Sequence, residues 1–227
     1  MRLHPAQEAA YLDDVAVGAL TREIVRRGCR VLQVHLLAPT VDGHVARLLE
    51  EFSPPFGARV LDVGCGVGGV AEAMSWLRPD LGFVLLNRSR AQLEMCPAGF
   101  ETVEADFHAM PFPNASFDAA MLCYVIGHGV LEEVLFEAAR VLNPGGVALL
   151  YDFTVEGPAR LLESVGYLAH PVEAIREAAA LAGFSIDVEL RPDTNTDEFR
   201  RLFDDSEAVA RAFDGVTPLL MRMEKAA

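Results

Sequence analysis

The stretch Arg59-Val60-Leu61-Asp62-Val63-Gly64-Cys65-Gly66-Val67-Gly68-Gly69 decides how this chain folds. Its first five residues form an apolar, β-branched run that is typical of a buried strand, and the glycines that follow mark a turn. Gly64 and Gly66 allow the backbone to come close to a ligand, and a helix that starts after Gly68 presents unpaired N–H groups. The stretch therefore predicts a strand, a ligand-binding turn and a helix.

Short apolar runs alternate with helical patterns in the rest of the chain. The predicted strands after the first are Gly82–Asn87, Thr102–Ala105, Phe117–Val125, Val147–Phe153, Phe184–Leu190 and Leu219–Met223. The predicted helices are Val70–Leu77, Ser89–Met95, Leu131–Leu142 and Val172–Ala182. This alternation indicates an α/β fold, in which a parallel sheet carries helices on both faces. Residues 6–52 contain two helical segments broken by Gly28 and Pro39, which predicts an N-terminal helical cap over 1–52 and an α/β domain over 53–227.

Composition excludes several classes of protein. The chain has 227 residues, 52% of them apolar and 23% charged, which fits one well-filled domain. Its net charge of −14 repels phosphate backbones, so nucleic acid is not an expected partner. The same charge disfavours a small anionic substrate unless arginine, histidine or a metal ion offsets it locally.

The four cysteines and the lengths of the apolar runs indicate the cellular compartment of the protein and whether it binds a membrane. Cys29, Cys65, Cys96 and Cys123 form no CxxC pair and have no histidine at zinc-ligand spacing, which favours a reduced intracellular protein without a metal site. The apolar runs are too short to span a bilayer and the chain starts without a signal-like segment. We therefore expect a cytoplasmic protein that acts on a small molecule, binds no membrane and is compatible with assembly into a homo-oligomer.

The glycine stretch has three readings: the ligand-binding turn described above, a dinucleotide-binding turn and a purely structural turn. Gly64, Gly66 and Gly69 satisfy the GxGxxG pattern of dinucleotide-binding turns. Against that reading, Asp62 precedes the first glycine by two residues, and the second strand ends in Asn87 where the NAD pattern has an acid. In the third reading, the glycines serve only to make a tight turn.

The chain resembles the class I S-adenosylmethionine-dependent methyltransferases over about residues 58–153. The resemblance rests on VLDVGCGVGG at 60–69 and on three motifs that follow it in order, Glu104–Phe107, Met110–Asp118 and Ala139–Gly146. It implies a Rossmann-like sheet of seven strands with the last strand antiparallel. It also implies that S-adenosylmethionine lies across the carboxyl ends of the first four strands.

The resemblance also implies which residues bind the cofactor. Asp62, Gly64, Cys65 and Gly66 would line its methionine part, and Asp106 and Phe107 would meet its adenine. Most members end the second strand with an acid that binds the ribose, whereas this chain has Asn87-Arg88 with Gln92 one helical turn later. The two amides would share the ribose hydroxyls, or Asn87 would simply cap a helix.

The Asn87-to-Gln92 spacing is similar to a subset that includes sterol C-methyltransferases, cyclopropane fatty acid synthases and prenyl diphosphate C-methyltransferases. The stretch Val188–Thr194, followed by the helical 198–203, is similar to the end of geranyl diphosphate C-methyltransferases. This resemblance implies methylation of an alkene carbon of a small isoprenoid diphosphate, such as isopentenyl diphosphate, through a carbocation and proton loss. The chain departs from the subset at 122–129, where no carboxylate follows the fourth strand.

Two other activities fit the same sequence. One is O- or N-methylation of a small secondary metabolite, which needs only a base or a desolvated lone pair. The other is cofactor binding without transfer, with the fold used as an interaction scaffold.

Aromatic and basic residues supply the candidates for chemistry. We expect Tyr124 and His128 to act as cation stabiliser and proton acceptor, and His35 to face the pocket, although each could simply pack. For the substrate, Arg22 and Arg26 would grip a diphosphate together with Mg²⁺, unless they are a solvated helix end. Tyr167, His170 and Glu173 would form a lid over the acceptor.

Overall fold

The computed structural model describes residues 29–162, 166–202 and 213–226. Its main sheet contains β1 (Arg59–Val63), β2 (Gly82–Asn87), β3 (Glu101–Glu104), β4 (Phe117–Cys123), β5 (Leu142–Val155), β8 (Phe184–Leu190) and β9 (Val216–Lys225). The strand order is β3-β2-β1-β4-β5-β9-β8. The first five strands pair in parallel, and β9 is antiparallel to both of its neighbours. The predicted seven-stranded α/β sheet with an antiparallel last strand is confirmed.

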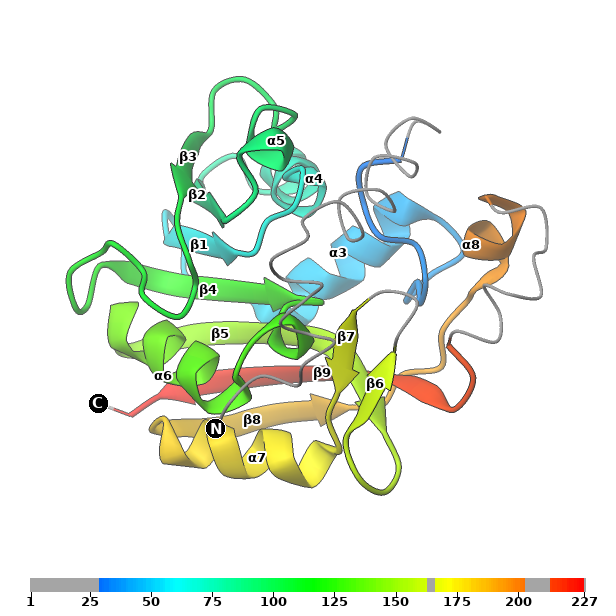
Figure 1. Ribbon diagram of the computed structural model, residues 1–227. Helices are drawn as coiled ribbons and strands as arrows, with labels where there is room; N and C mark the ends of the chain where they lie inside the picture. The colour runs from blue at the N-terminus through cyan, green and yellow to red at the C-terminus, as the bar shows by residue number, and fades with distance from the viewer. Residues whose placement is uncertain (1–28, 163–165, 203–212, 227) are drawn as a thin grey trace.

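Helices cover both faces of this sheet (Figure 1). They are α3 (Val41–Phe52), α4 (Gly69–Leu77), α5 (Arg90–Leu93), α6 (Leu131–Val141), α7 (Val172–Leu181) and α8 (Asp197–Leu202), with a short 3-10 helix η1 (Ile126–His128). Side chains of β1 alternate between the faces, because successive strand residues point to opposite sides. Val60 packs with α3 and α4, whereas Leu61 and Val63 pack with α6 and α7.

The structure contains one feature that the sequence did not predict, a small hairpin of β6 (Arg160–Leu162) and β7 (Tyr167–Ala169). Strands of three residues are too short to show an alternating pattern. The predicted helix over 89–95 is shorter in the structure, where α5 runs from Arg90 to Leu93. It starts after Ser89 because that side chain caps the first turn by accepting from the Gln92 N–H at 3.3 Å. The other predicted helices end within a residue of the observed ones.

The predicted N-terminal cap is described only from residue 29 onward. Within it, α3 lies on the sheet and buries Val45, Leu48 and Phe52 against the strands. The division of the chain at residue 53 therefore stays a prediction, since α3 shares the core of the following domain. In the described parts of the chain, every helix is too short or too polar to cross a bilayer.

Arg30 ties the segment before α3 to the glycine turn. Its guanidinium donates to the carbonyl oxygens of Val67 and Met95 at 2.9 Å each and pairs with Glu72 at 3.0 Å. The Arg30 carbonyl lies over the first residue of α4, where a Cβ on Gly69 would meet that oxygen at 2.0 Å. Glycine at 69 is therefore required for this segment to lie across the helix.

Replacing Gly69 with alanine should lower the free energy of unfolding by about 1–3 kcal/mol, because the added methyl overlaps backbone that cannot move independently. The matched control is Gly82→Ala, where the new Cβ meets nothing within 4 Å. Denaturant unfolding of both variants checks this. Equal stability of the two variants would show that residue 30 does not pack on α4 in solution.

Candidate active site

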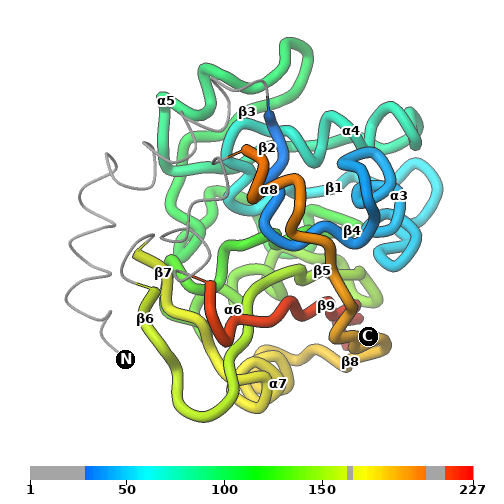
Figure 2. Tube along the Cα trace, turned by 90° about the vertical axis from the view of Figure 1, so that its right-hand side faces the viewer, coloured from blue at the N-terminus to red at the C-terminus, as the bar shows by residue number. Residues whose placement is uncertain are grey.

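The carboxyl ends of β1, β2, β4 and β5 meet at one edge of the sheet, and two segments from distant parts of the chain cross that edge. Figure 2, which looks onto this edge, shows residues 29–40 running beside α8 and the stretch that leads into it. The two segments are joined by a pair of backbone hydrogen bonds between Leu36 and Asn195 at 3.0 and 2.8 Å. The edge is therefore partly enclosed.

The glycine turn after β1 forms one half of this edge. Gly64 and Gly66 have φ angles of 68° and 57°, in the left-handed region that favours glycine. A Cβ on Gly64 would lie 2.8 Å from the Val125 side chain, whereas a Cβ on Gly66 would meet nothing within 4 Å. The turn is thus packed on one side and open at Gly66.

Asp62 lies beneath the turn with only 3% of its surface exposed. Burial raises the pKa of this carboxyl well above its usual value. Its Oδ2 atom is buried and has no hydrogen-bond partner among the described residues. A buried acceptor of this kind needs a donor, and a ligand with an ammonium or hydroxyl group would supply one.

The two amides predicted to share the ribose do come together. Asn87 Nδ2 donates to Gln92 Oε1 at 2.6 Å and to the Gly66 carbonyl at 3.3 Å. Asn87 Oδ1 accepts from the Arg88 N–H at 3.0 Å. The alternative that Asn87 caps the next helix is wrong, because Ser89 occupies that position.

Cys65 sits inside the turn, and its thiol donates to the Gly66 carbonyl at 3.6 Å. The Cys96 thiol donates to the same oxygen at 3.8 Å. Together with the Asn87 amide, these contacts concentrate three donors on one carbonyl, which fixes the peptide plane of the turn. Cys65 therefore supports the turn whether or not it also touches the cofactor.

Asp106 and Phe107 lie in the loop after β3. The Asp106 carboxylate accepts from the backbone N–H of His108 at 2.9 Å and from its ring Nδ1 at 2.7 Å, and His108 Nε2 accepts from the Val130 N–H at 3.0 Å. Burial opposes ionisation of Asp106, but these bonds and the nearby Arg88 outweigh it and lower its pKa. Phe107 is buried and its ring lies 4.7 Å from that of His108. Contact of this pair with adenine stays a prediction.

These residues fit S-adenosylmethionine, the cofactor that the sequence resemblance implies. Asp62 offers an unpartnered buried acceptor, Gly66 an open approach to backbone, and Asn87 with Gln92 a pair of amides at the end of β2. The carboxyl of Asp62, the amides and the glycine turn all lie at one sheet edge, as a ligand spanning strand ends requires.

The other half of the edge is an aromatic cluster made of Tyr124, Tyr151, Phe153, Tyr167 and Phe213. The Phe153 ring is central, with centroid distances of 4.6 Å to Tyr124, 5.4 Å to Tyr167 and 5.3 Å to Phe213. Tyr124 has a φ of 59°, which is unusual for a residue with a bulky side chain. Its hydroxyl is buried without a hydrogen-bond partner in the described part of the chain.

Two histidines lie at the margins of the aromatic cluster. The His128 ring stands edge-on to Tyr167 at 4.8 Å, and the His35 ring edge-on to Phe153 at 5.9 Å. Burial lowers the pKa of each imidazole to about 4, so both are uncharged at neutral pH. His35 Nδ1 pairs with Thr194 Oγ1 at 3.0 Å, and no described residue partners its buried Nε2. Both rings are therefore free of charge and able to accept a proton.

Asp152 is the residue that sequence reasoning missed. The expectation that no carboxylate follows β4 is correct for the chain order, but the structure brings one from β5 to the same place. Asp152 Oδ2 accepts from the backbone N–H groups of Val125 and Ile126 at 2.9 and 3.2 Å. A carboxylate inside an otherwise apolar strand, in Leu150-Tyr151-Asp152-Phe153, was the available signal.

The predicted substrate residues divide into three groups. Tyr167 belongs to the aromatic cluster and His170 directly follows β7. Both are buried, with 2% and 4% exposure, and their role as a lid over the acceptor stays a prediction. Glu173 is exposed on α7 and pairs with Arg176 at 3.7 Å, outside the cluster. Arg22 and Arg26 lie outside the described residues.

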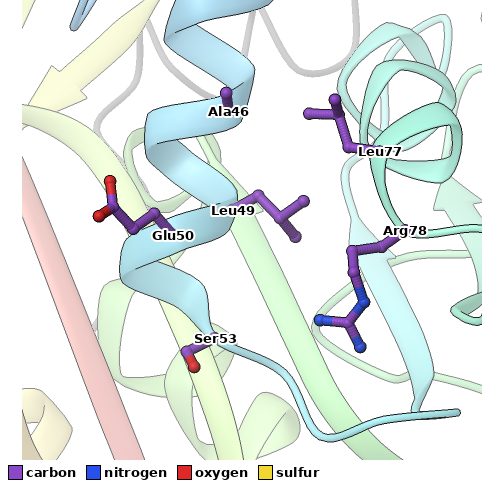
Figure 3. Close-up of a pocket in the computed structure, with 6 residues that line it drawn as sticks. All are labelled: Ala46, Leu49, Glu50, Ser53, Leu77 and Arg78. Carbon is purple, nitrogen blue, oxygen red and sulfur yellow. The ribbon is translucent and has the colours of Figure 1, made fainter.

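A surface hollow of about 340 Å³ lies elsewhere, between α3 and the end of α4. Leu49 and Leu77 face each other across it, with Arg78 below them (Figure 3). α4 starts at the glycine turn and ends here, so the hollow is at the opposite end of the sheet from the predicted site. None of the predicted site residues lines it.

Comparison with known proteins shows what the glycine-turn region is similar to. The family model described as "Methyltransferase domain" matches residues 61–150. The chain is 35% identical over 135 residues to a sterol 24-C-methyltransferase of Aspergillus fumigatus, an alignment covering 55% of this chain and 36% of that protein. It is also 35% identical over 119 residues to a botryococcene C-methyltransferase of Botryococcus braunii, covering 48% and 31%. The chain thus matches about a third of the length of these relatives.

Solved structures share the fold over the whole chain. The [4+2]-cyclase SpnF superposes with a TM-score of 0.79 at 18% identity, covering 100% of this chain and 99% of SpnF. Geranyl diphosphate C-methyltransferase from Streptomyces coelicolor A3(2), solved with Mg²⁺, a thiolodiphosphate and S-adenosyl-L-homocysteine, superposes with a TM-score of 0.77 at 15% identity, covering 98% and 99%. Residues 61–150 therefore match the methyltransferase domain model, within a chain that has the class I methyltransferase fold.

Proposed function

We propose that the chain transfers a methyl group from S-adenosylmethionine to an alkene carbon of an isoprenoid acceptor. The observation that carries this proposal is the aromatic cluster with two uncharged histidines directly beside the glycine turn. The relatives named above are C-methyltransferases of sterols and of botryococcene, and one structural neighbour methylates geranyl diphosphate. These names support carbon methylation of an isoprenoid.

The residues of this chain perform three tasks in that reaction. When bound, S-adenosylmethionine supplies an electrophilic methyl group, so the protein must mainly hold the acceptor carbon in line and exclude water. The ring faces of Tyr124 and Phe153 stabilise the positive charge that develops on the acceptor after methylation. His128 then takes the proton whose loss restores an alkene, with His35 as the second uncharged acceptor.

The finer proposal concerns the head group of the acceptor. We propose a small isoprenoid diphosphate, held by Arg22 and Arg26 with Mg²⁺. The support is the likeness in fold to geranyl diphosphate C-methyltransferase. The described residues contain no group of three or more His, Cys, Asp or Glu side chains that could hold a metal ion, so the Mg²⁺ proposal depends on the diphosphate.

O- or N-methylation is the second candidate, because an uncharged buried histidine could equally take a proton from a hydroxyl or an ammonium group. One assay separates the candidates. Protein is incubated with methyl-labelled cofactor and geranyl diphosphate, isopentenyl diphosphate, a sterol, phenols or amines, each with and without Mg²⁺. Label on phenols or amines alone would reject alkene methylation, and cofactor binding without any transfer would favour the scaffold alternative.

Asn87→Ala should weaken binding of S-adenosylhomocysteine by about 5- to 30-fold, because it removes a half-buried amide and leaves the buried Gln92 without its partner. Isothermal titration calorimetry measures this directly. The control is Asn114→Ala, whose side chain accepts from Arg140 at the opposite end of β4. Unchanged affinity in the Asn87 variant would place the ribose elsewhere.

Tyr124→Leu should lower turnover by about 10-fold, because it removes a ring face that stabilises the cation. His128→Ala should lower turnover by about 100-fold or more, because general acid–base groups contribute on that scale. Cofactor affinity should stay within about twofold for both variants. Trp76→Ala, at a side chain that is 81% exposed, serves as the control with unchanged turnover. A loss of cofactor affinity that matches the loss of turnover would instead place these side chains on the cofactor.

A further inference from the structure

Asp152 is wholly buried at the carboxyl end of β5, yet the aromatic cluster and the histidines account for the chemistry proposed above without it. Its two oxygens accept four hydrogen bonds. Oδ2 accepts from the N–H groups of Val125 and Ile126, and Oδ1 accepts from the Phe153 N–H at 2.6 Å and from the Tyr167 hydroxyl. A buried carboxylate with every lone-pair direction in use is an organising group rather than a chance burial.

The first thing it organises is Tyr124. This residue adopts a left-handed backbone conformation, which a side chain of its size rarely takes without support from its surroundings. The Tyr124 N–H donates to the Tyr151 carbonyl at 2.9 Å, and Asp152 holds the next two N–H groups along the chain. β5 therefore fixes the backbone from 124 to 126, and with it the direction of the Tyr124 ring.

The second residue that Asp152 organises is His128. The Tyr167 hydroxyl donates to Asp152, and the Tyr167 ring fills the space over Gly127, where a Cβ would meet its Cε1 atom at 2.2 Å. The same ring stands edge-on to His128 at 4.8 Å. Asp152 thus holds Tyr167 in place, and Tyr167 holds η1 with its histidine. One carboxylate positions both residues proposed for cation stabilisation and proton transfer.

The groups packed around Asp152 leave its charge uncompensated. They are Cys123 at the end of β4, Tyr124 directly after it, His128 on η1, Tyr151 on β5 and Tyr167 on β7. Asp62 of β1 also acts on the Cys123 thiol. Burial raises the pKa of the thiol and of the three phenols, and it lowers that of the imidazole to about 4, so all five are uncharged at neutral pH. Burial also raises the pKa of Asp152 to about 6, although its hydrogen bonds act to lower it. The carboxylate is therefore ionised at pH 7.5.

We propose that Asp152 is the positioning residue of the acceptor site: it locks Tyr124 and His128 in place, and its buried negative charge favours an acceptor that becomes positively charged. The proposal rests on the function proposed above for the nature of the acceptor. A fixed charge behind aromatic rings acts at short range in a medium of low dielectric constant, where its attraction for a cation is much stronger than in water. In this proposal the carboxylate acts through the residues that it holds and through its charge, and it makes no contact with the acceptor.

A pair of shape-matched probes tests the charge without requiring turnover. Geranyldimethylamine is cationic at neutral pH, and its carbon isostere has CH in place of the protonated nitrogen. Binding of each to the full chain, saturated with S-adenosylhomocysteine, is measured by calorimetry at pH 7.5. We expect the wild-type chain to bind the cation about 10-fold or more tightly than the isostere. Asp152→Asn should lose this preference and bind the isostere with unchanged affinity. Asp187→Asn, which removes an exposed carboxylate on β8, is the charge-matched control and should keep it.

The pH dependence adds a readout that a purely structural role would not move. The preference for the cation should fade as the pH drops through about 6, because the raised pKa of Asp152 lets it take up a proton there. Tyr167→Phe removes a hydrogen bond that favours the ionised form of Asp152, so it should move the midpoint of this pH dependence upward. The same variant tests the proposal if Asp152→Asn does not fold. The proposal is overturned if the wild-type chain binds the cation and the isostere equally well. It is also overturned if the preference for the cation survives in Asp152→Asn and disappears in Asp62→Asn.

The two proposals fail in different ways. A chain that selects the cation through Asp152 but methylates no alkene would contradict the proposed function alone. A chain that methylates an alkene at the wild-type rate after Asp152→Asn, with the pH profile unchanged, would contradict the role of Asp152 alone.

Discussion

The close approach of the glycine turn to the segment after β4 joins the two halves of the site. Gly64 has no side chain, and Val125 occupies the space that a Cβ would need. Asp152 holds the same Val125 through its N–H group from the other side. The position of the predicted cofactor-binding turn is therefore tied, through a single residue, to the carboxylate that orders the aromatic cluster. A shift in either half would be transmitted to the other, because both are packed against the same short segment.

The sheet and the glycine turn could be predicted from the sequence because their signals are local. The bounds of β1, β2 and β8 match the predicted ranges. β1 and β2 are mostly apolar runs next to a glycine, and β8 alternates apolar with polar residues directly after Gly183. Asn87 and Gln92 could be paired in advance, because their spacing brings them to one side of a single turn. The chain order of the motifs also located the edge of the sheet where the site lies.

The acceptor half could not be predicted to the same degree, because it is assembled from segments far apart in the sequence. Asp152 acts at the end of β4 although it belongs to β5, and only the parallel register of Cys123 with Tyr151 brings it there. The place of Tyr167 in a hairpin could not be predicted, because the hairpin is too short to show a pattern. The charge states of His35 and His128 depend on burial by several elements, which no single stretch of sequence records.

The placement of β9 has a consequence for how the chain folds during synthesis. β8 is joined to the rest of the sheet only through β9, which pairs with β5 on one side and β8 on the other. Residues 216–225 leave the ribosome after every other strand of this sheet, so until then the long edge of β5 and the apolar side of β8 have no strand between them. Closure of the sheet is therefore a late event, and a nascent chain that lacks these residues exposes a strand edge open to pairing with other chains.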